Sequence, residues 1–357
     1  MLDKLEQVEL RFEKVNELIC LPEVVNDQNQ YKELMRELKN LTPVVECFRA
    51  YKEADETEKE ASELLSDNTQ EKEFKELLEE EFKASKQRKE ELYNELKTLL
   101  LPKDPNDYKN VIIEIRGGAG GDEAALFAAS LFRMYSMYAE SRGWKTDVMN
   151  INETGLGGIK EISFMVEGEG AYSRFKFESG VHRVQRVPET ESGGRIHTST
   201  VTVAVLPEAE EVDIDIDPTD LQIDTYRASG AGGQHVNKTE SAIRITHIPT
   251  GTVVECQDER SQYKNKDRAL KILRSRLLDA EREKQDSEIA DERRSQVGTG
   301  DRSERIRTYN FPQGRVSDHR IGLTLYKIEA IMNGDIDEII DALITADTAK
   351  KLQASEG

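Results

Sequence analysis

The sequence predicts an α+β protein in which an N-terminal helical bundle is followed by α+β units. Three observations support this fold class. Apolar residues over residues 1–102 recur at three- and four-residue steps, which is the spacing of one helix face. Strand-like runs such as residues 111–115 appear after Pro102. A polar stretch over residues 259–296 ends at Gly298 and predicts one long helix. These patterns together are typical of helices packed on sheets.

The first hundred residues are predicted to be helical throughout. The first apolar stripe consists of Leu2, Leu5, Val8, Phe12, Val15 and Leu18. Further helices are expected near residues 31–39, 43–65 and 71–101, with breaks at Leu21-Pro22 and at residues 66–68. Their outer faces are charged, so an antiparallel bundle or hairpin is expected. Two uses remain open, a generic coiled-coil adaptor and a dedicated protein-docking domain.

Two small α+β units are predicted after residues 102–105, which end the bundle. The first has strands at residues 111–115, 145–152, 159–167 and 196–206, with a helix at 122–141. An acidic connector at residues 213–220 leads to strands at 221–227, 242–248 and 252–257, and then to the long helix. Residues 303–357 are expected to add two short strands and two short helices. The predicted domain boundaries are 1–105, 106–215, 216–300 and 301–357.

Composition restricts the class of protein. Apolar residues make up 37% of the chain and charged residues 34%, and no run of eighteen apolar residues occurs. The amino terminus lacks the features of a signal peptide or a mitochondrial presequence. Cys20, Cys47 and Cys256 are odd in number and far apart, which argues against disulfides and against a zinc site. A cytoplasmic protein without a bound metal is therefore expected.

Charge is distributed unevenly along the chain. The net charge is −20, made up of −10 over residues 1–100, −9 over 101–220, +3 over 221–320 and −4 over the remainder. An acidic chain with one locally basic third is expected to touch RNA there and to repel it elsewhere.

The most informative segment is the glycine-rich stretch of residues 227–239. Three glycines in four residues, Gly230, Gly232 and Gly233, leave the backbone free to approach a ligand. Backbone N–H groups in such a loop can stabilise an oxyanion or bind phosphate, and the Gln234 side chain can hydrogen-bond without acting as a base. A plain turn is the alternative. The segment lacks the Lys-Ser or Lys-Thr pair that a P-loop requires. No carboxylate partner is evident that would make His235 a general base.

A second segment, residues 179–200, reads as a basic loop stiffened by Pro188. It carries the basic residues Arg183, Arg186 and Arg195. It also offers the imidazole of His197 and the hydroxyl groups of Thr190, Thr198 and Ser199. Single-stranded RNA is recognised by stacking on rings and by hydrogen bonds to base edges. A solvated hairpin tip without a ligand is the alternative.

A third segment, Gly117-Gly118-Ala119-Gly120-Gly121, opens the helix predicted at residues 122–141. A glycine run before a helix is an anion site in many proteins. A nucleotide-binding turn is the rival interpretation, although the P-loop lysine and the G-x-G-x-x-G spacing are both absent. Glu123 is either a ligand-contacting residue or a first-turn residue favoured by the helix dipole.

Two of these segments resemble one known family. Residues 227–234, with Gly232-Gly233-Gln234, and the tripeptide Pro188-Glu189-Thr190 are similar to bacterial class I peptide chain release factors of the type that reads UAA and UAG. The sister class has Ser-Pro-Phe at the tripeptide. The resemblance implies that Gly232, Gly233 and Gln234 enter the ribosomal peptidyl transferase centre. There the Gln234 N–H stabilises the transition state or leaving group, and its side chain, commonly N5-methylated, admits water.

The resemblance also implies contacts with the stop codon. Thr190 of the Pro188-Glu189-Thr190 tripeptide bonds the first two bases, and His197 stacks between the second and third. Further contacts come from Gln185 and Thr198 to the third base and from Gly120 and Glu123 to the first. Residues 298–313 and Asp318-His319-Arg320 are family-like as well.

The resemblance extends to domains and partners. It implies a helical domain (1–105) facing the ribosomal stalk and a class II release-factor GTPase. Three domains are expected to follow. They are a codon-recognition domain (106–215), a GGQ domain with a long basic helix (216–300), and a C-terminal domain that packs with the codon-recognition domain (301–357). The expected partners are the ribosome with its rRNA, the mRNA stop codon and the P-site peptidyl-tRNA, together with the GTPase and a glutamine N5-methyltransferase. No membrane, metal or organic cofactor is expected, and the ribosome is expected to perform the hydrolysis.

Two rival functions remain. Ribosome-rescue hydrolases share the glycine loop and the basic helix but read no codon. A nucleotide-binding enzyme built on residues 117–121 would bind ATP or GTP stoichiometrically. Coupling of codon and loop needs a hinge, for which residues 213–220 and 298–301 are the candidates.

Overall fold

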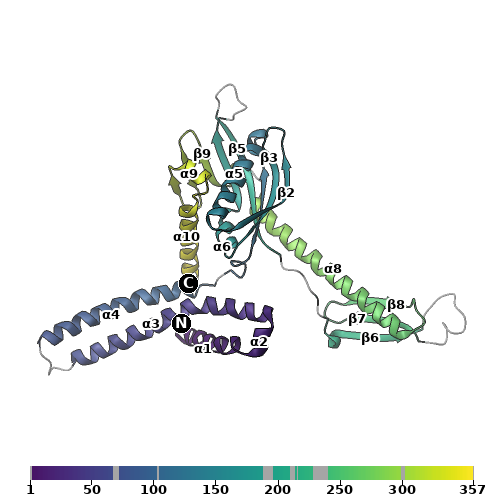
Figure 1. The fold of residues 1–357 in the computed structure, drawn as a ribbon, viewed down its shortest axis with the longest axis horizontal. Helices are drawn as coiled ribbons and strands as arrows, with labels where there is room; N and C mark the ends of the chain where they lie inside the picture. Colours follow the sequence, from purple (N-terminus) through teal and green to yellow (C-terminus); the bar gives the residue numbers. More distant parts are fainter. Residues whose placement is uncertain are drawn as a thin grey trace. The chain divides into compact units, whose positions relative to one another are not determined.

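The computed structural model describes residues 2–66, 72–102, 104–187, 196–209, 214, 216–227, 240–298 and 302–356 (Figure 1). The chain divides into two compact units, Met1–Asp104 with Asp341–Gly357, and Pro105–Ile340. Helices and strands are both abundant, so the predicted α+β class is confirmed. None of the helices in the described part of the chain combines the length and the apolar character that a membrane crossing requires.

The first unit is built on a helical bundle of α1 (Leu2–Ile19), α2 (Pro22–Asn26), α3 (Gln28–Ser66) and α4 (Lys72–Leu99). Its main apolar core joins the long helices through Leu5, Val44, Cys47, Phe48, Ala54, Leu92 and Leu96. A smaller core closes the turn between α1 and α3 with Val15, Val24 and Leu34. The bundle buries one stripe of each helix and leaves the charged faces in solvent, as the apolar spacing predicted.

One prediction for this unit is wrong. The helices expected at residues 31–39 and 43–65 are a single helix, α3, with Pro43 inside it. Proline removes one backbone hydrogen bond and usually ends a helix. Here Val44, Val45, Cys47 and Phe48 are all buried directly after Pro43, so tertiary packing keeps the chain helical. The Thr42 hydroxyl also donates to the Leu38 carbonyl at 2.7 Å.

The second unit contains an eight-stranded sheet in the order β11-β10-β9-β4-β5-β1-β3-β2. Neighbouring strands pair antiparallel, except β4 and β9, which are parallel. The strands are β1 (Val111–Gly117), β2 (Lys145–Glu153), β3 (Ile159–Glu167), β4 (Gly180–Arg186), β5 (His197–Pro207), β9 (Arg305–Asn310), β10 (Arg315–Asp318) and β11 (Leu323–Leu325).

Helix α5 (Asp122–Ser141) covers one face of this sheet (Figure 1). Alternate residues of β1, β3 and β5 are fully buried, as the two-residue period of a strand requires. The α5 residues that are fully buried include Phe127, Leu131, Met134, Tyr135 and Tyr138. Short helices α6 (Ala171–Phe175), η1 (Lys176–Glu178), η3 (Arg302–Glu304) and α9 (Ile328–Met332) connect the strands, and α10 (Asp337–Glu356) follows.

Two further predictions are corrected in this sheet. Residues 180–186, predicted to belong to a loop, form strand β4, because β5 and β9 supply backbone partners on its two sides. The C-terminal segment contributes three strands where two were expected, and all three extend the large sheet. In both cases the decisive hydrogen bonds come from partner strands, and β9 lies more than a hundred residues from β4.

A three-stranded sheet, β6-β7-β8, lies elsewhere in the second unit. Its strands are Leu221–Tyr226, Ala242–His247 and Thr252–Cys256, and the 3-10 turn η2 (Pro218–Asp220) precedes them. Helix α8 (Gln262–Val297) has 36 residues, which is about 54 Å at 1.5 Å per residue. Its first half packs on this sheet through a shared core of Ile243, Ile245, Val254, Cys256, Ala269, Leu273 and Leu277.

Candidate functional site

Several predicted codon-contacting residues meet at one end of the large sheet. Strands β4 and β5 are paired there so that Gln185 lies opposite Thr198 and Arg186 lies opposite His197. His197 is exposed, while Gln185 and Thr198 are half-buried. The hairpin therefore presents Gln185, Thr198 and His197 within two adjacent residue pairs.

The glycine turn before α5 is bound to the start of β5. The Gly118 N–H donates to the Thr200 carbonyl at 2.8 Å, and the Thr200 N–H donates to the Ala119 carbonyl at 2.9 Å. The Ala119 N–H also donates to the Thr200 hydroxyl at 3.0 Å. Gly120 has a φ of +139°, and a Cβ there would lie 2.3 Å from the Ser199 Oγ, so only glycine fits. The turn is thereby held beside the β4–β5 hairpin.

Glu123 is fixed in the first turn of α5 by Arg186. The carboxylate is 4% exposed and pairs with the Arg186 guanidinium, which in turn lies over the Phe311 ring at 5.6 Å. The second oxygen of Glu123 is buried and has no hydrogen-bond partner in the described part of the chain. Sequence reasoning named Arg186 only as a basic loop residue and missed this pairing, because Glu123 and Arg186 are 63 residues apart.

Gln185 is held by the end of β9. The Asn310 amide donates to the Gln185 side-chain oxygen at 3.2 Å, and the Phe311 N–H donates to the Gln185 carbonyl at 3.0 Å. Asn310 was not predicted to take part, although it lies in the family-like segment 298–313. The C-terminal strands therefore help to position the predicted codon-contacting side chains.

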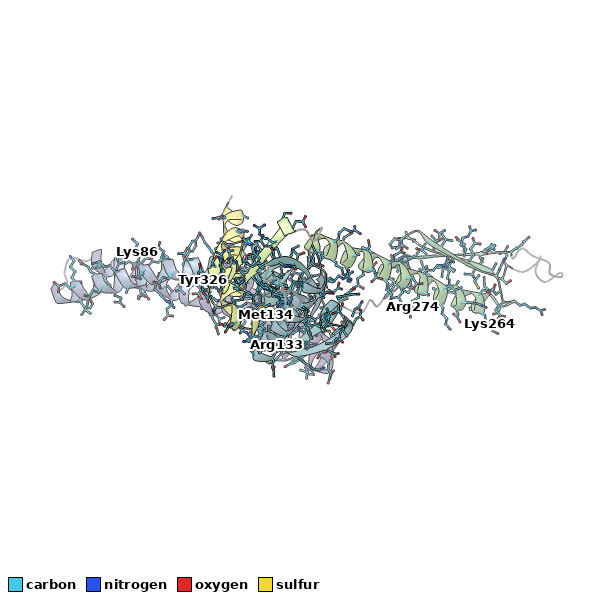
Figure 2. The ribbon with its side chains drawn as sticks, turned by 90° about the horizontal axis from the view of Figure 1, so that it is seen from above. Lys86, Arg133, Met134, Lys264, Arg274 and Tyr326 are labelled. Atoms are coloured by element: carbon cyan, nitrogen blue, oxygen red, sulfur yellow. The ribbon has the colours of Figure 1, made fainter. Side chains whose placement is uncertain are left out.

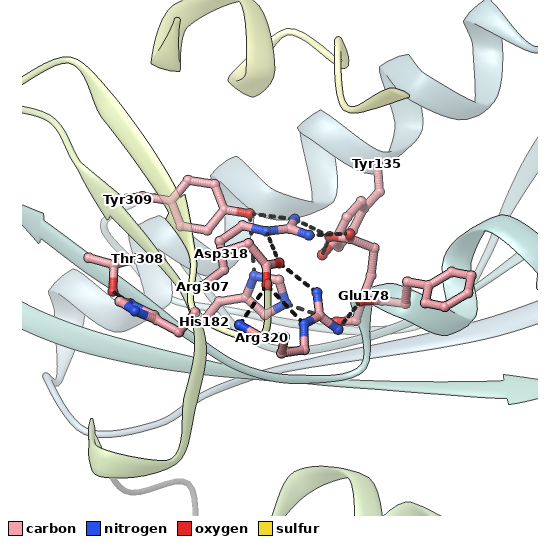
Figure 3. Close-up of polar contacts among 10 residues, drawn as sticks. Tyr135, Glu178, His182, Arg307, Thr308, Tyr309, Asp318 and Arg320 are labelled. Atoms are coloured by element: carbon pink, nitrogen blue, oxygen red, sulfur yellow. Dashed lines mark hydrogen bonds and ion pairs between the residues drawn. The ribbon is translucent and has the colours of Figure 1, made fainter. Parts of the chain in front are cut away.

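A fully buried ionic network lies where β4 and β9 begin (Figure 3). Arg307 in β9 donates two hydrogen bonds to Glu178, at 2.6 and 2.7 Å, and one to Asp318 in β10, at 3.2 Å. The Tyr135 hydroxyl of α5 donates to Glu178 at 2.9 Å. Arg307, Glu178 and Asp318 are 0–2% exposed. Burial opposes the charge on Glu178, yet the Arg307 guanidinium keeps the pKa of this carboxyl below its usual value.

His182 completes the network in a neutral state. Its Nε2–H donates to the Glu178 carbonyl at 2.8 Å, so Nδ1 is the acceptor for the Tyr309 hydroxyl at 3.3 Å. Burial lowers the pKa of His182 to about 4, because the charged imidazolium would lose its hydration. His182 is thus a structural residue inside the sheet, whereas the exposed His197 is the one at the predicted codon site.

Acid is expected to destabilise the second unit through His182. The folded pKa of about 4 lies below the ordinary value of 6.5, so the unfolded chain binds more protons between these values. The free energy of unfolding should fall by about 3 kcal/mol as the pH drops through this window. Urea unfolding followed by the fluorescence of Trp144, which packs on Tyr138 and Phe175 in this unit, measures the effect. His182→Gln should flatten the slope, and an equal slope in both proteins would refute the assignment.

The base of the glycine loop is also well defined. Tyr226 at the end of β6 pairs with Ala242 at the start of β7, and Arg227 pairs with Glu240 at 3.5 Å. The buried Asn265 amide donates to the Ser241 carbonyl at 2.8 Å and to the Glu259 carbonyl at 2.9 Å. Both ends of the loop are therefore anchored on the three-stranded sheet, and Asn265 of α8 holds the end at Ser241.

The remaining predicted site residues lie outside the described residues. They are Pro188, Glu189 and Thr190 of the tripeptide and Gly232, Gly233 and Gln234 of the glycine loop. The same holds for Arg195 and His235. Across the described ranges, no group of three or more His, Cys, Asp or Glu side chains could hold a metal ion.

The basic character of α8 is confined to its first half. Residues 262–276 contain six Lys or Arg and one Asp, whereas residues 277–297 contain four Lys or Arg and seven Asp or Glu. Lys264 and Arg274 are exposed, and both belong to the part of α8 that packs on the three-stranded sheet (Figure 2). The predicted long basic helix is therefore basic only in the half that packs on the three-stranded sheet.

Comparison with known proteins gives consistent matches. The PCRF domain family matches residues 8–203 and the RF-1 domain family matches residues 210–320. A protein of Acetivibrio thermocellus named peptide chain release factor 1 is 63% identical over 99% of this chain and 98% of its own length. A protein of the same name from Carboxydothermus hydrogenoformans is 61% identical over 100% of this chain and 99% of its own length. Another, from Clostridioides difficile, is 60% identical over 99% of this chain and 100% of its own length. The solved structure of RF2 of Thermus thermophilus is 35% identical, covers 98% of this chain and 96% of its own, and has a TM-score of 0.48.

Proposed function

Since the chain belongs to the peptide chain release factor 1 family, we propose that it reads the stop codons UAA and UAG and releases the nascent peptide through Gly232-Gly233-Gln234. The chain acts in translation termination, in which a stop codon is recognised on the ribosome and peptidyl-tRNA is hydrolysed. We propose in addition the codon specificity, the residues that read the codon and promote hydrolysis, and the division of the chemistry between protein and ribosome.

The proposed reader is the end of the large sheet together with the Pro188-Glu189-Thr190 tripeptide. The observation that carries it is the convergence of the glycine turn at Gly120, the fixed Glu123 and the Gln185–Thr198 pair. Gly120 and Glu123 select the first base, and Thr190 of the Pro188-Glu189-Thr190 tripeptide bonds the first two. The His197 ring stacks between the second and third bases, and stacking of this kind contributes about 1–3 kcal/mol per base. Gln185 and Thr198 contact the third base.

The proposed hydrolytic element is the Gln234 N–H at the tip of the glycine loop. Such a donor, aimed at the developing oxyanion or the leaving oxygen, stabilises the transition state without an acid or base from the protein. The Gln234 side chain, N5-methylated in this proposal, admits water and excludes larger nucleophiles. The peptidyl transferase centre of the ribosome carries out the reaction, and the chain by itself is not an enzyme.

The proposed partners follow from charge and position. The basic first half of α8, with Lys264 and Arg274, binds rRNA phosphates near the loop. The acidic helical unit repels RNA and faces the ribosomal stalk and a class II release-factor GTPase. A glutamine N5-methyltransferase modifies Gln234. We place the protein in the cytoplasm, where translation takes place.

Peptide release from programmed ribosomes tests the function directly. Ribosomes carrying labelled peptidyl-tRNA are presented with UAA, UAG, UGA or a sense codon in the decoding site. Rapid release is expected with UAA and UAG only. Release at the same rate on every codon would instead identify a rescue hydrolase, and release on none would reject the proposal. Stoichiometric binding of ATP or GTP by the free protein would favour the nucleotide-binding alternative.

The tripeptide is expected to set the identity of the accepted codons. Replacement of residues 188–190 by Ser-Pro-Phe (Pro188→Ser, Glu189→Pro, Thr190→Phe) should reduce release on UAG by at least about tenfold, or about 1.4 kcal/mol. Release on UGA should rise, while the maximal rate on UAA stays close to that of the unchanged chain. The ratio of kcat/KM values on UAG and UGA is the measurement. An unaltered ratio in a variant of unchanged stability would show that the tripeptide does not read the codon.

A further inference from the structure

Helix α8 is attached to both sheets of the second unit. Its first half shares a core with β7 and β8, where Ala269 and Leu273 are fully buried. Its last two turns lie on the large sheet, where they contact β5 and β1 through polar side chains. Residues 210–213, 215 and 299–301 lie outside the described residues. Within the described part of the chain, these contacts of α8 link the two sheets.

The most specific contact is made by Gln296. Its side-chain oxygen accepts from the Val205 N–H at 2.7 Å, and its side-chain nitrogen donates to the Val205 carbonyl at 2.8 Å. Strand β4 begins at Gly180 opposite Val203, two residues short of Val205. The Gln296 amide therefore takes the place that a residue of a neighbouring strand would occupy, and it offers a donor and an acceptor as a peptide group does.

A second contact fixes the same turn of the helix. Arg293 binds the Glu114 carboxylate of β1 through two hydrogen bonds, at 2.8 and 2.7 Å. The Glu114 side chain is 11% exposed and that of Arg293 35%, so solvent screens this pair only in part. Two parallel N–H···O bonds give a pair of this kind a defined direction. Together, Arg293 and Gln296 hold α8 in one orientation on β1 and β5.

The two strands that hold α8 are also the strands that lead to the predicted reader. Strand β1 continues from Glu114 through Gly117 into the turn that carries Gly120. Strand β5 runs from His197 and Thr198 to Val205 without a register shift against β1 or β4. Seven residues of extended strand span about 23 Å. Continuous, paired backbone therefore connects the reader with the α8 attachment.

We propose that Arg293 and Gln296 are positioning residues for peptide release: they orient α8, and with it the glycine loop, relative to the bound codon. The proposal rests on the proposed function above, since it assigns the loop to hydrolysis and the β4–β5 end to reading. Neither residue touches the codon or the peptidyl ester. Their loss should lower the maximal rate of release, because the loop is presented in the reactive orientation less often.

Near-isosteric variants test this in the full-length protein. Gln296→Glu keeps the acceptor for the Val205 N–H but places a second oxygen against the Val205 carbonyl. Arg293→Met removes the bidentate pair and keeps much of the side-chain volume. Arg294→Met is the matched control, since Arg294 is next in sequence, is 79% exposed and pairs with Asp291 of its own helix at 3.2 Å. Release on UAA is measured over a range of factor concentrations.

Gln296→Glu and Arg293→Met should each lower kcat for release about tenfold, with a half-saturating concentration within about twofold of the unchanged protein. Arg294→Met should change neither. A purely structural role would lower the thermal stability or raise the half-saturating concentration in parallel. A wild-type kcat in both variants, or a loss confined to the half-saturating concentration, would overturn the proposal.

A distance measurement on the free protein separates this proposal from the function itself. Spin labels at Asp147→Cys in β2 and Asp224→Cys in β6, both exposed positions, with Cys20→Ser, report the two sheets. The distance distribution should broaden in Gln296→Glu and Arg293→Met and stay narrow in Arg294→Met. Equal distributions in all three would refute the attachment even if release is normal. If the unchanged protein releases no peptide, the proposed function is rejected. The distance distributions still test whether Arg293 and Gln296 attach α8 to the large sheet.

Discussion

Gln234→Pro is expected to abolish peptide release and to leave stop-codon binding within about twofold of the unchanged protein. Proline has no N–H, so the donor that the loop is proposed to present is removed. Loss of one oxyanion donor lowers kcat by about 10²–10³ in other acyl-transfer sites. The rate of release on UAA at saturating factor, and the affinity for UAA-programmed ribosomes under the same conditions, are the two quantities to compare.

The control for this prediction is Gln234→Ala. Alanine keeps the backbone N–H and removes the side-chain amide, so release should continue and accept larger nucleophiles such as hydroxylamine more readily. The described loop base, with the Arg227–Glu240 pair and the Asn265 contacts, is unaffected by either change. If Gln234→Pro lost codon binding and release to the same extent, the division of labour between loop and sheet would be wrong.

Arg307→Met is expected to destabilise the second unit by about 3–5 kcal/mol. The substitution leaves the Glu178 carboxylate buried without its guanidinium, and an uncompensated buried charge has a cost of this order. Asp318 loses Arg307 as well but keeps its pair with Arg320 at 2.7 Å. Trp144 is the one tryptophan of the chain and packs in this unit, so its fluorescence during urea unfolding reports the change. Because Arg307 lies in β9, the strand that positions Gln185, release on UAA should fall as well.

Two further variants test whether the unpaired charge causes this loss of stability. Arg133→Met on the exposed side of α5, where Arg133 donates to Asn333 at 3.2 Å, should change stability by no more than about 0.5 kcal/mol. Combining Arg307→Met with Glu178→Gln removes the unpaired charge and should recover part of the stability. A double variant that is no more stable than Arg307→Met would show that packing, and not charge, accounts for the loss.

Codon reading and loop presentation involve different elements of one unit. Residues at the reader come from β4, β5, the turn before α5 and the end of β9, while the loop rises between β6 and β7. Helix α8 is the described element that touches both sheets. We therefore expect codon recognition to change the rate of hydrolysis through the orientation of that helix, or through the connecting segments around it, including the hinge candidates at residues 213–220 and 298–301.

Much of this protein is readable from its sequence. The apolar spacing predicted the helical first unit, the strand-like runs predicted β1, β2, β3 and the three-stranded sheet, and Gly298 marked the end of α8. The motifs at residues 188–190 and 232–234 led to the family that the comparisons confirm. These features are local, since periodicity, glycine runs and short motifs depend on residues that are close together in the chain.

Tertiary structure alone decided the remainder. Pro43 stays helical because Val44, Val45 and Phe48 are buried beside it, and residues 180–186 form a strand because β9 pairs with them from the far end of the chain. The partners Glu123–Arg186, Glu178–Arg307 and Gln296–Val205 are between 63 and 129 residues apart. No local pattern encodes such pairs, because the free energy that selects them depends on residues that only the fold brings together, where water is partly or fully excluded.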